Sequence, residues 1–99
     1  MFQIRIIKSY RDIVALCDSE LIGKKFEEGN LQLDIKEDFF KGEDFNEEQA
    51  SLILKKMEKE DATFYIVGEK SINLCIKKDL IKKDFVKYIQ GIPFCLILL

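Results

Sequence analysis

The start of the chain alternates between apolar and polar positions in a way that predicts two short β-strands. Positions 2, 4 and 6 are apolar while positions 3 and 5 are polar, which is the period of a half-buried strand. A polar turn over residues 8–12 separates this strand from the short apolar run at residues 13–17. The two strands are predicted to pair as an antiparallel hairpin.

The next segment, residues 17–43, is polar and rich in turn-forming residues. One helical turn is expected just before Gly23, and a tight turn is expected at Gly29 and Asn30. Residues 31–35 alternate again between apolar and polar residues, which predicts a strand with one solvent-exposed face. The segment 37–44 is expected to form a loop that its two adjacent phenylalanines hold in place.

The clearest helix is predicted over residues 47–59. Asn46, two acidic residues and Gln49 form the pattern of a capping box, in which side chains satisfy the free N–H groups of the first turn. Apolar residues at i, i+3, i+4 and i+7 from Ala50 then form one face that can pack on a core.

The remaining elements are a strand, a helix and a closing hairpin. The β-branched and aromatic run 63–67 predicts a strand buried on both of its faces, and a second helix is expected over residues 69–78. Strands over 85–89 and 92–98 are expected to pair around a two-residue turn, with a competing helical interpretation of residues 83–89. Together these elements predict a single α+β domain spanning 1–99, with a mainly antiparallel sheet and two main helices.

Two interpretations of the apolar tail, residues 92–99, are open. It forms either an inner strand of the core, which we favour, or an exposed edge that serves as an interface.

The amino-acid composition indicates a globular domain and excludes several classes of enzyme. The 99 residues include 47% hydrophobic and 34% charged residues, as expected for a globular domain, and no apolar run is long enough to span a membrane. We therefore expect a cytoplasmic protein. The absence of histidine excludes hydrolases that use Ser-His or Cys-His pairs. The three cysteines are far apart in sequence and are expected to be small buried apolar residues, so neither a metal site nor a cofactor is predicted.

Charge is distributed unevenly along the chain. Residues 1–50 carry 7 basic and 12 acidic side chains, a net charge of −5, whereas residues 51–99 carry 9 basic and 6 acidic side chains, a net charge of +3. The lysine pairs 77–78 and 82–83 are interpreted as solvated surface, with RNA binding through this lysine-rich half as an alternative.

Two short stretches and one group of acidic residues are candidates for a binding or catalytic site. The stretch 67–71 places a glycine before a helix, where free N–H groups can bind an anion, although the full phosphate-loop motif is absent and a plain turn is favoured. Gly23, Lys24 and Lys25 form a weaker candidate for phosphate. Acidic residues also concentrate in the predicted turns, where they are expected to be solvated: Asp18, Glu20, Glu27, Glu28, Glu37, Asp38 and Glu43.

Several stretches of the chain resemble the sequence of a known family. The chain resembles the archaeal domain-of-unknown-function family 424 over nearly its whole length, in Cys17–Lys24, Phe26, Gly29, Phe39–Glu43, Glu48, Ala50, Val67–Glu69 and Gly91–Pro93. The resemblance implies a stand-alone archaeal α+β domain with no established activity, whose genes tend to lie near translation genes. It also implies a histidine after the Gly-Ile-Pro turn, where this chain has Phe94 and Cys95.

We therefore expect a non-catalytic accessory or adaptor domain that binds a protein or ribonucleoprotein partner, with a translation component suspected. The alternative is a small ligand-binding protein or enzyme that uses carboxylates near Gly68. Because a binding role tolerates the missing histidine more easily than catalysis does, an enzyme is disfavoured and no catalytic residue is assigned. If the fold brings the turns together, the binding surface consists of Asp18, Gly23, Lys24, Gly42, Glu43, Gly68 and Glu69.

Overall fold

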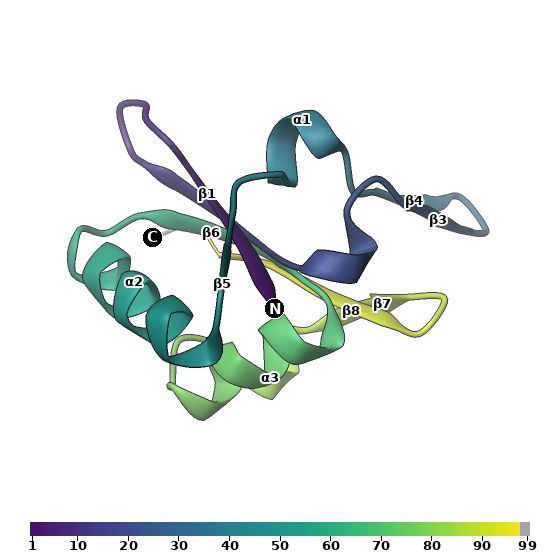
Figure 1. Cartoon of the computed structure of the whole chain (residues 1–99). Coiled ribbons are helices and arrows are strands. Elements are labelled where there is room, and N and C mark those ends of the chain that lie inside the picture. Colours follow the sequence, from purple (N-terminus) through teal and green to yellow (C-terminus); the bar gives the residue numbers. More distant parts are fainter. Residues whose placement is uncertain (98–99) are drawn as a thin grey trace.

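The structure is a computed structural model that describes residues 1–97, and its centre is a six-stranded mixed sheet (Figure 1). The strand order is β5-β1-β2-β6-β8-β7, and β3 and β4 form a separate two-stranded hairpin. The strands are β1 Phe2–Ile7, β2 Ile13–Asp18, β3 Lys25–Glu28, β4 Leu31–Asp34, β5 Glu43–Phe45, β6 Thr63–Val67, β7 Lys87–Ile89 and β8 Ile92–Ile97.

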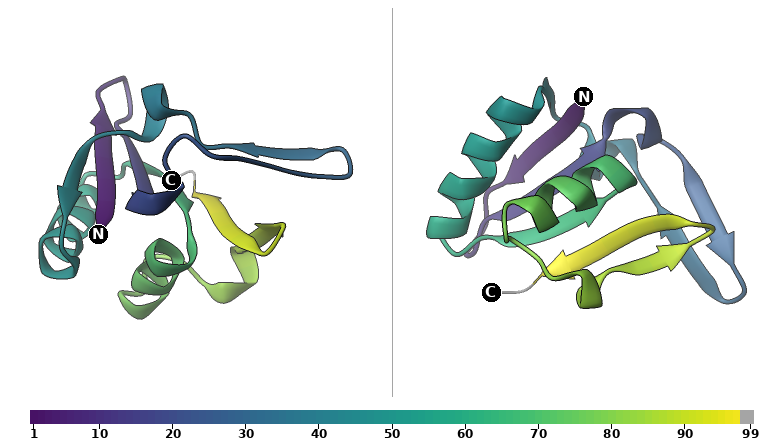
Figure 2. Two further views of the ribbon diagram at one scale, coloured as in Figure 1. Left: turned by 45° about the vertical axis from the view of Figure 1, so that its right-hand side comes forward. Right: turned by 90° about the horizontal axis from the view of Figure 1, so that it is seen from below.

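Helices lie on both sides of this sheet, but they cover the two sides unequally. Helices α2 (Glu47–Lys59) and α3 (Glu69–Lys77) pack on one face, whereas the short helix α1 (Glu37–Phe40) and the β3–β4 hairpin lie on the other (Figure 2). Two 3₁₀ turns, η1 (Ser19–Leu21) and η2 (Lys83–Phe85), complete the elements. The α+β class with two main helices and a mostly antiparallel sheet is confirmed.

Each face of the sheet has its own core. The larger core lies under α2 and α3 and is built around Leu16, Leu54, Phe64, Ile66 and Cys75, which are at most 1% exposed. The smaller core lies under α1 and the hairpin and includes Cys17, Leu33, Ile35, Phe40 and Val67. The second core extends over only part of its face.

Elements whose sequence pattern is local are confirmed. The first hairpin pairs β1 with β2 in antiparallel register, and α2 has the predicted bounds. The Asn46 side chain accepts a hydrogen bond from the Gln49 backbone N–H at 2.8 Å, and the Gln49 side chain accepts one from the Asn46 N–H at 3.0 Å. This is the predicted capping box.

The prediction of a loop over residues 37–44 is wrong. Residues 37–40 form α1, and residues 43–45 form the edge strand β5, which pairs with β1. Phe40 is 2% exposed and packs edge-to-face against Phe39 and Tyr65, with ring centroids 5.0 Å and 5.2 Å apart. Burial of this aromatic pair therefore stabilises a turn of helix that a four-residue sequence does not specify by itself.

Strand β6 pairs in parallel with β2, and one prediction about β6 is wrong. Buried residues were expected on both of its faces, but Thr63 and Tyr65 are only half-buried, whereas Val67 is fully buried. The reason is that the smaller core, which includes Leu33, Ile35 and Phe40, covers Val67 but does not extend to Thr63. The Thr63 end of β6 therefore lies on a part of the sheet that the smaller core does not cover.

The closing hairpin is confirmed with adjusted bounds. Strand β7 begins at residue 87 rather than 85, because residues 83–85 form the 3₁₀ turn η2. Of the alternative helix over residues 83–89, only this single turn is present. In the apolar tail, Cys95 is 3% exposed and faces the larger core, whereas Leu96 is 56% exposed. The predicted end of this strand at residue 98 lies outside the described residues.

Candidate functional site

The carboxylate of Asp18 lies at the N-terminus of α3, at the turn where the sequence favoured a plain connection over an anion-binding site. Asp18 Oδ1 accepts hydrogen bonds from the Ser71 backbone N–H at 2.8 Å and from Ser71 Oγ at 2.7 Å, and Oδ2 accepts one from the Lys70 N–H at 3.0 Å. Both side chains are buried, with Asp18 3% and Ser71 0% exposed. The anion at this helix start is therefore the protein's own carboxylate.

Gly68 makes this contact possible. Its φ of 110° is a backbone conformation that L side chains rarely adopt, and a Cβ atom built on it would lie 2.4 Å from the Asp18 carboxyl carbon. Only glycine leaves room for the carboxylate to reach the helix. The structure thus brings Asp18 and Gly68 of the predicted set into direct contact.

Gly23 and Lys24 lie at the base of the β3–β4 hairpin. The Gly23 N–H donates to the Ile35 carbonyl at 2.8 Å, and the Lys24 N–H donates to the Leu21 carbonyl at 3.1 Å. Since both N–H groups already have partners within the fold, they do not form the phosphate-binding turn considered from the sequence. The Lys24 side chain remains exposed.

Gly42 and Glu43 lie beside β1, where β5 joins the sheet. The Gly42 N–H donates to the Gln3 side-chain oxygen at 3.0 Å, and a Cβ atom on Gly42 would lie 2.1 Å from the Ile4 carbonyl oxygen. Glu43 is exposed on this edge strand. Gly42 is therefore required by close backbone packing rather than by the shape of a turn.

Glu69 is exposed and lines a pocket between α3 and the β7–β8 hairpin. Among the described residues, no hydrogen bond or ion pair joins Lys24, Glu43 or Glu69 to the Asp18–Gly68 contact. The predicted set is thus divided over four places, with one pair in contact.

The other acidic residues of the predicted turns lie at the surface. Glu20 forms an ion pair with Lys70 at 3.5 Å. A backbone hydrogen bond within its own residue, assisted by Lys70, lowers the pKa of the Glu20 carboxyl. This direction is opposite to the raised pKa that a general acid near neutral pH requires.

The cysteines are buried and free, as the sequence predicted. Burial, with Asp18 nearby, raises the pKa of the Cys17 thiol to about 12, and burial likewise raises the pKa of Cys75 to about 12. Such thiols stay protonated and unreactive at neutral pH. Within residues 1–97, no three or more Cys, Asp or Glu side chains are grouped so that they could hold a metal ion.

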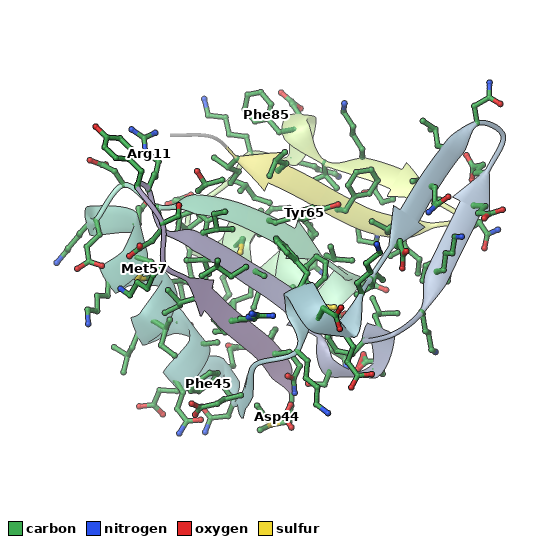
Figure 3. All side chains as sticks on the ribbon, turned by 90° about the horizontal axis from the view of Figure 1, so that it is seen from above. Arg11, Asp44, Phe45, Met57, Tyr65 and Phe85 are labelled. Atoms are coloured by element: carbon green, nitrogen blue, oxygen red, sulfur yellow. The ribbon has the colours of Figure 1, made fainter. Side chains whose placement is uncertain are left out.

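The feature that the sequence did not predict is the half of the sheet that α1 leaves uncovered. In Figure 3, Tyr65 lies beside α1, and no helix formed by residues 1–97 covers the part of the sheet beyond it. Strand pairing places eight half-buried or exposed side chains on this surface, which we call the open sheet face: Arg5, Ile7, Ile13, Thr63, Tyr65, Lys87, Phe94 and Leu96.

Residues on the same side of the sheet but under α1 and the hairpin are fully buried, as Ala15, Cys17, Val67 and Ile89 show. The contrast marks the boundary of the open sheet face. Phe94, where the family resemblance implies a histidine, lies inside it. The sequence contained one hint of this surface, because Thr63 and Tyr65 bring hydroxyl groups into a strand that was otherwise expected to be buried.

Two of the pockets on the molecule lie beside the β7–β8 hairpin. One of about 500 Å³ lies between η2 and the end of β8; Lys87 and Leu96 of the open sheet face contribute to it, together with Asp79, Lys82 and several apolar side chains. The other, of about 380 Å³, is the pocket beside Glu69, to which Lys83 and Tyr88 also contribute. No helix within residues 1–97 has the length and apolar character needed to cross a membrane.

Comparison with known proteins supports the fold and the family. The chain is similar to a solved structure described as an uncharacterized conserved protein from Methanopyrus kandleri, with a TM-score of 0.85 and 19% sequence identity over 97% of this chain and 89% of that one. At this identity the likeness shows the fold alone. No curated protein matches the chain. Residues 7–99 match the sequence profile of a family described as "Protein of unknown function (DUF424)", and the chain belongs to this family.

Proposed function

We propose that the protein is a non-catalytic binding module and that its open sheet face is the surface that holds the partner. The observation that carries this proposal is the uncovered half of the sheet, where Leu96 is 56% exposed beside half-buried Tyr65 and Phe94. A contiguous apolar surface on a sheet is expected to be covered in the working complex. The buried Asp18, in contrast, is occupied by hydrogen bonds within the fold.

The proposed partner is a component of the translation machinery. This part of the proposal rests on the family resemblance, which implies genes that lie near translation genes. A binding role also agrees with the chemistry of the chain, since it has no histidine to act as a base near neutral pH.

Co-sedimentation through a density gradient of archaeal lysate tests the proposal. The tagged protein is expected to migrate with a ribosomal subunit or an initiation complex, and Leu96→Glu is expected to shift it to the free fraction, because a charge on the open sheet face opposes an apolar contact. Leu52→Glu is the matched control, since Leu52 is 69% exposed on α2, which packs on the opposite face. Migration of the wild type only as a free monomer or dimer would contradict the proposal.

A second candidate function is small-ligand binding in the pocket beside Glu69. The observation that favours it is the meeting of an acidic, a basic and a hydroxyl side chain, Glu69, Lys83 and Tyr88, around a volume of about 380 Å³. Thermal-shift screening with amino acids and nucleotides tests it. A bound ligand is expected to raise the melting temperature of the wild type and to lose this effect in Glu69→Gln.

A further inference from the structure

We propose that the open sheet face binds single-stranded RNA, with bases stacked on Tyr65 and Phe94 and phosphates held by Arg5 and Lys87. This inference rests on the proposed function and names the chemistry of the partner. Three independent features of the surface support it: the position of the aromatic rings, the sign of the charges, and the spacing of the charged side chains.

The two aromatic residues lie on neighbouring strands near the middle of the sheet. In the antiparallel pair of β6 and β8, Tyr65 lies opposite Leu96, and Phe94 lies opposite Val67. Tyr65 and Phe94 are therefore diagonal neighbours on one face, about 7–8 Å apart. Half-buried aromatic side chains at this spacing on a sheet offer the accessible part of each ring to successive bases for stacking.

The ring of Tyr65 is held in position before any ligand arrives. Phe39 and Phe40 of α1 pack edge-to-face against it, with centroid distances of 5.9 Å and 5.2 Å. A ring that is already fixed loses little conformational freedom when a base stacks on it. Helix α1 thus contacts one side of the Tyr65 ring, and the sheet lies beneath the ring (Figure 3).

The charges on the open sheet face favour an anionic partner. Its ionisable groups other than Tyr65 are Arg5 and Lys87, both of which are cations, although the whole chain has a net charge of −2. Neither cation forms an ion pair within the described residues. An acidic or apolar protein segment could use the aliphatic residues, but unpaired cations on both sides of two aromatic rings match a phosphate backbone with bases better.

The two cations are spaced for an extended strand that crosses the sheet. Arg5 lies on β1 and Lys87 on β7, four strand spacings apart in the order β1-β2-β6-β8-β7, which corresponds to about 19 Å. Ala15 of β2 lies opposite Arg5 of β1 on one side and opposite Tyr65 of β6 on the other, so these three residues are aligned across the strands. Phe94 of β8 lies directly opposite Lys87 of β7. A single-stranded chain that crosses these strands meets a cation, two rings and a second cation in turn, whereas the bases of a duplex cannot reach the rings.

Fluorescence anisotropy of the purified protein with labelled eight-nucleotide oligo(U) and oligo(A) RNA tests the inference. Binding of the RNA is expected, and Tyr65→Leu and Phe94→Leu are each expected to weaken it about tenfold, because each removes a stacking surface. Arg5→Gln combined with Lys87→Gln is expected to weaken binding and to reduce the slope of log K against log salt by about 1.4. The matched control, Lys77→Gln with Lys78→Gln, removes the same charge from the C-terminal end of α3, on the opposite face of the sheet, and is expected to retain the affinity.

A measurement on the unmodified protein guards against variants that fail to fold. Addition of oligo(U) is expected to shift the amide resonances of β1, β6, β7 and β8 and to leave those of α2 unchanged. Absence of binding, equal binding of a duplex, or a loss of binding confined to the lysine control would overturn the inference. Equal binding of single-stranded DNA supports the site but overturns the choice of RNA.

The outcomes for this inference and for the proposed function can be separated. If the oligonucleotides do not bind but Leu96→Glu still releases the protein from a sedimenting complex, then the open sheet face binds a protein and the RNA inference is wrong. If no complex forms in the gradient while oligo(U) binds at the open sheet face, the translation partner is wrong and the RNA site stands.

Discussion

At the scale of single residues, Asp18 determines how α3 begins. Its carboxylate receives three hydrogen bonds from the first turn of the helix while nearly excluded from water. Hydrogen bonds to a buried charged acceptor contribute more than those between neutral groups, and donors left without a partner are costly. Asp18 therefore acts as an N-cap supplied from 52 residues away in sequence.

Asp18→Asn is expected to lower the free energy of unfolding by about 2–3 kcal/mol, because an amide offers one acceptor oxygen where the carboxylate offers two. Urea denaturation measures the change. Ser51→Ala removes an exposed side-chain hydrogen bond to the Glu47 carbonyl and is expected to change stability by less than about 0.5 kcal/mol. Similar losses in the two variants would contradict the role of Asp18.

Gly68→Ala is expected to destabilise the protein by more than about 3 kcal/mol, since it combines backbone strain with a clash against the Asp18 carboxylate. Gly91→Ala is the matched control, because Gly91 has φ of 77° but no atom within 4 Å of a new Cβ. This variant is expected to lose only the roughly 1–2 kcal/mol of left-handed strain. Thermal denaturation of both variants separates strain from clash, and equal shifts would show that no clash exists.

The buried thiols predict a loss of stability at high pH. Burial raises the pKa of Cys17 and Cys75 from an ordinary value of 9.0 to about 12, so both thiols stay neutral in the folded state where the unfolded chain ionises. Their contribution is fully present below pH 9 and is lost as pH rises toward 12, at up to about 1.4 kcal/mol per pH unit for each thiol. Denaturation of the wild type and of Cys17→Ala with Cys75→Ala at several alkaline pH values tests this, and equal slopes would contradict it.

At the scale of elements, the β3–β4 hairpin is fastened to the main sheet through Gln90. The Gln90 side-chain amide donates to the Glu27 carbonyl at 2.6 Å, and the Gln90 backbone N–H donates to the Glu28 carboxylate at 2.8 Å. Because Gln90 has φ of 50°, glycine can replace it without backbone strain.

Gln90→Gly is therefore expected to keep the β7–β8 turn and to free the hairpin. Amide hydrogen exchange in β3 and β4 is expected to become about tenfold faster, which corresponds to one lost hydrogen bond, while exchange in β1 and β2 is unchanged. Unchanged exchange in β3 would show that the contacts of the hairpin base suffice to hold it.

The elements also show how far the sequence can predict the fold. Strand β1 and helix α2 were predictable because their period and caps lie within a few residues of one another. Helix α1 was not predictable, since its stability comes from burying Phe40 against Tyr65, which follows it by 25 residues. The parallel pairing of β2 with β6 joins segments about fifty residues apart, and no local pattern encodes it.

The candidate site was predictable only in part, for the same reason. Asp18 and Gly68 could be chosen because they are polar and glycine positions that carry the family resemblance, but their contact depends on the alignment of β2 with β6. The open sheet face could not be chosen, because an apolar strand residue such as Leu96 has the same sequence pattern whether or not a helix covers it.

At the scale of the whole molecule, surface charges are expected to contribute little to stability. The described residues form five ion pairs, and in four of them both side chains are at least half exposed. Raising NaCl from about 0.1 M to about 1 M is therefore expected to change the free energy of unfolding by less than about 1 kcal/mol. Chemical denaturation by urea at both salt concentrations measures this, and a larger loss would indicate that the pairs act as a network.

The contact between Asp18 and Gly68 also acts as a check on strand register. Cys17 lies opposite Val67 across the parallel pair, so Asp18 meets the start of α3 only when β2 and β6 are aligned as observed. A slip by one residue would turn the carboxylate to the other side of the sheet and would send the Cys17 thiol to the helix instead. Misaligned pairings thus leave both an uncapped helix and a buried unpaired charge, and the chain is steered toward one topology while it folds.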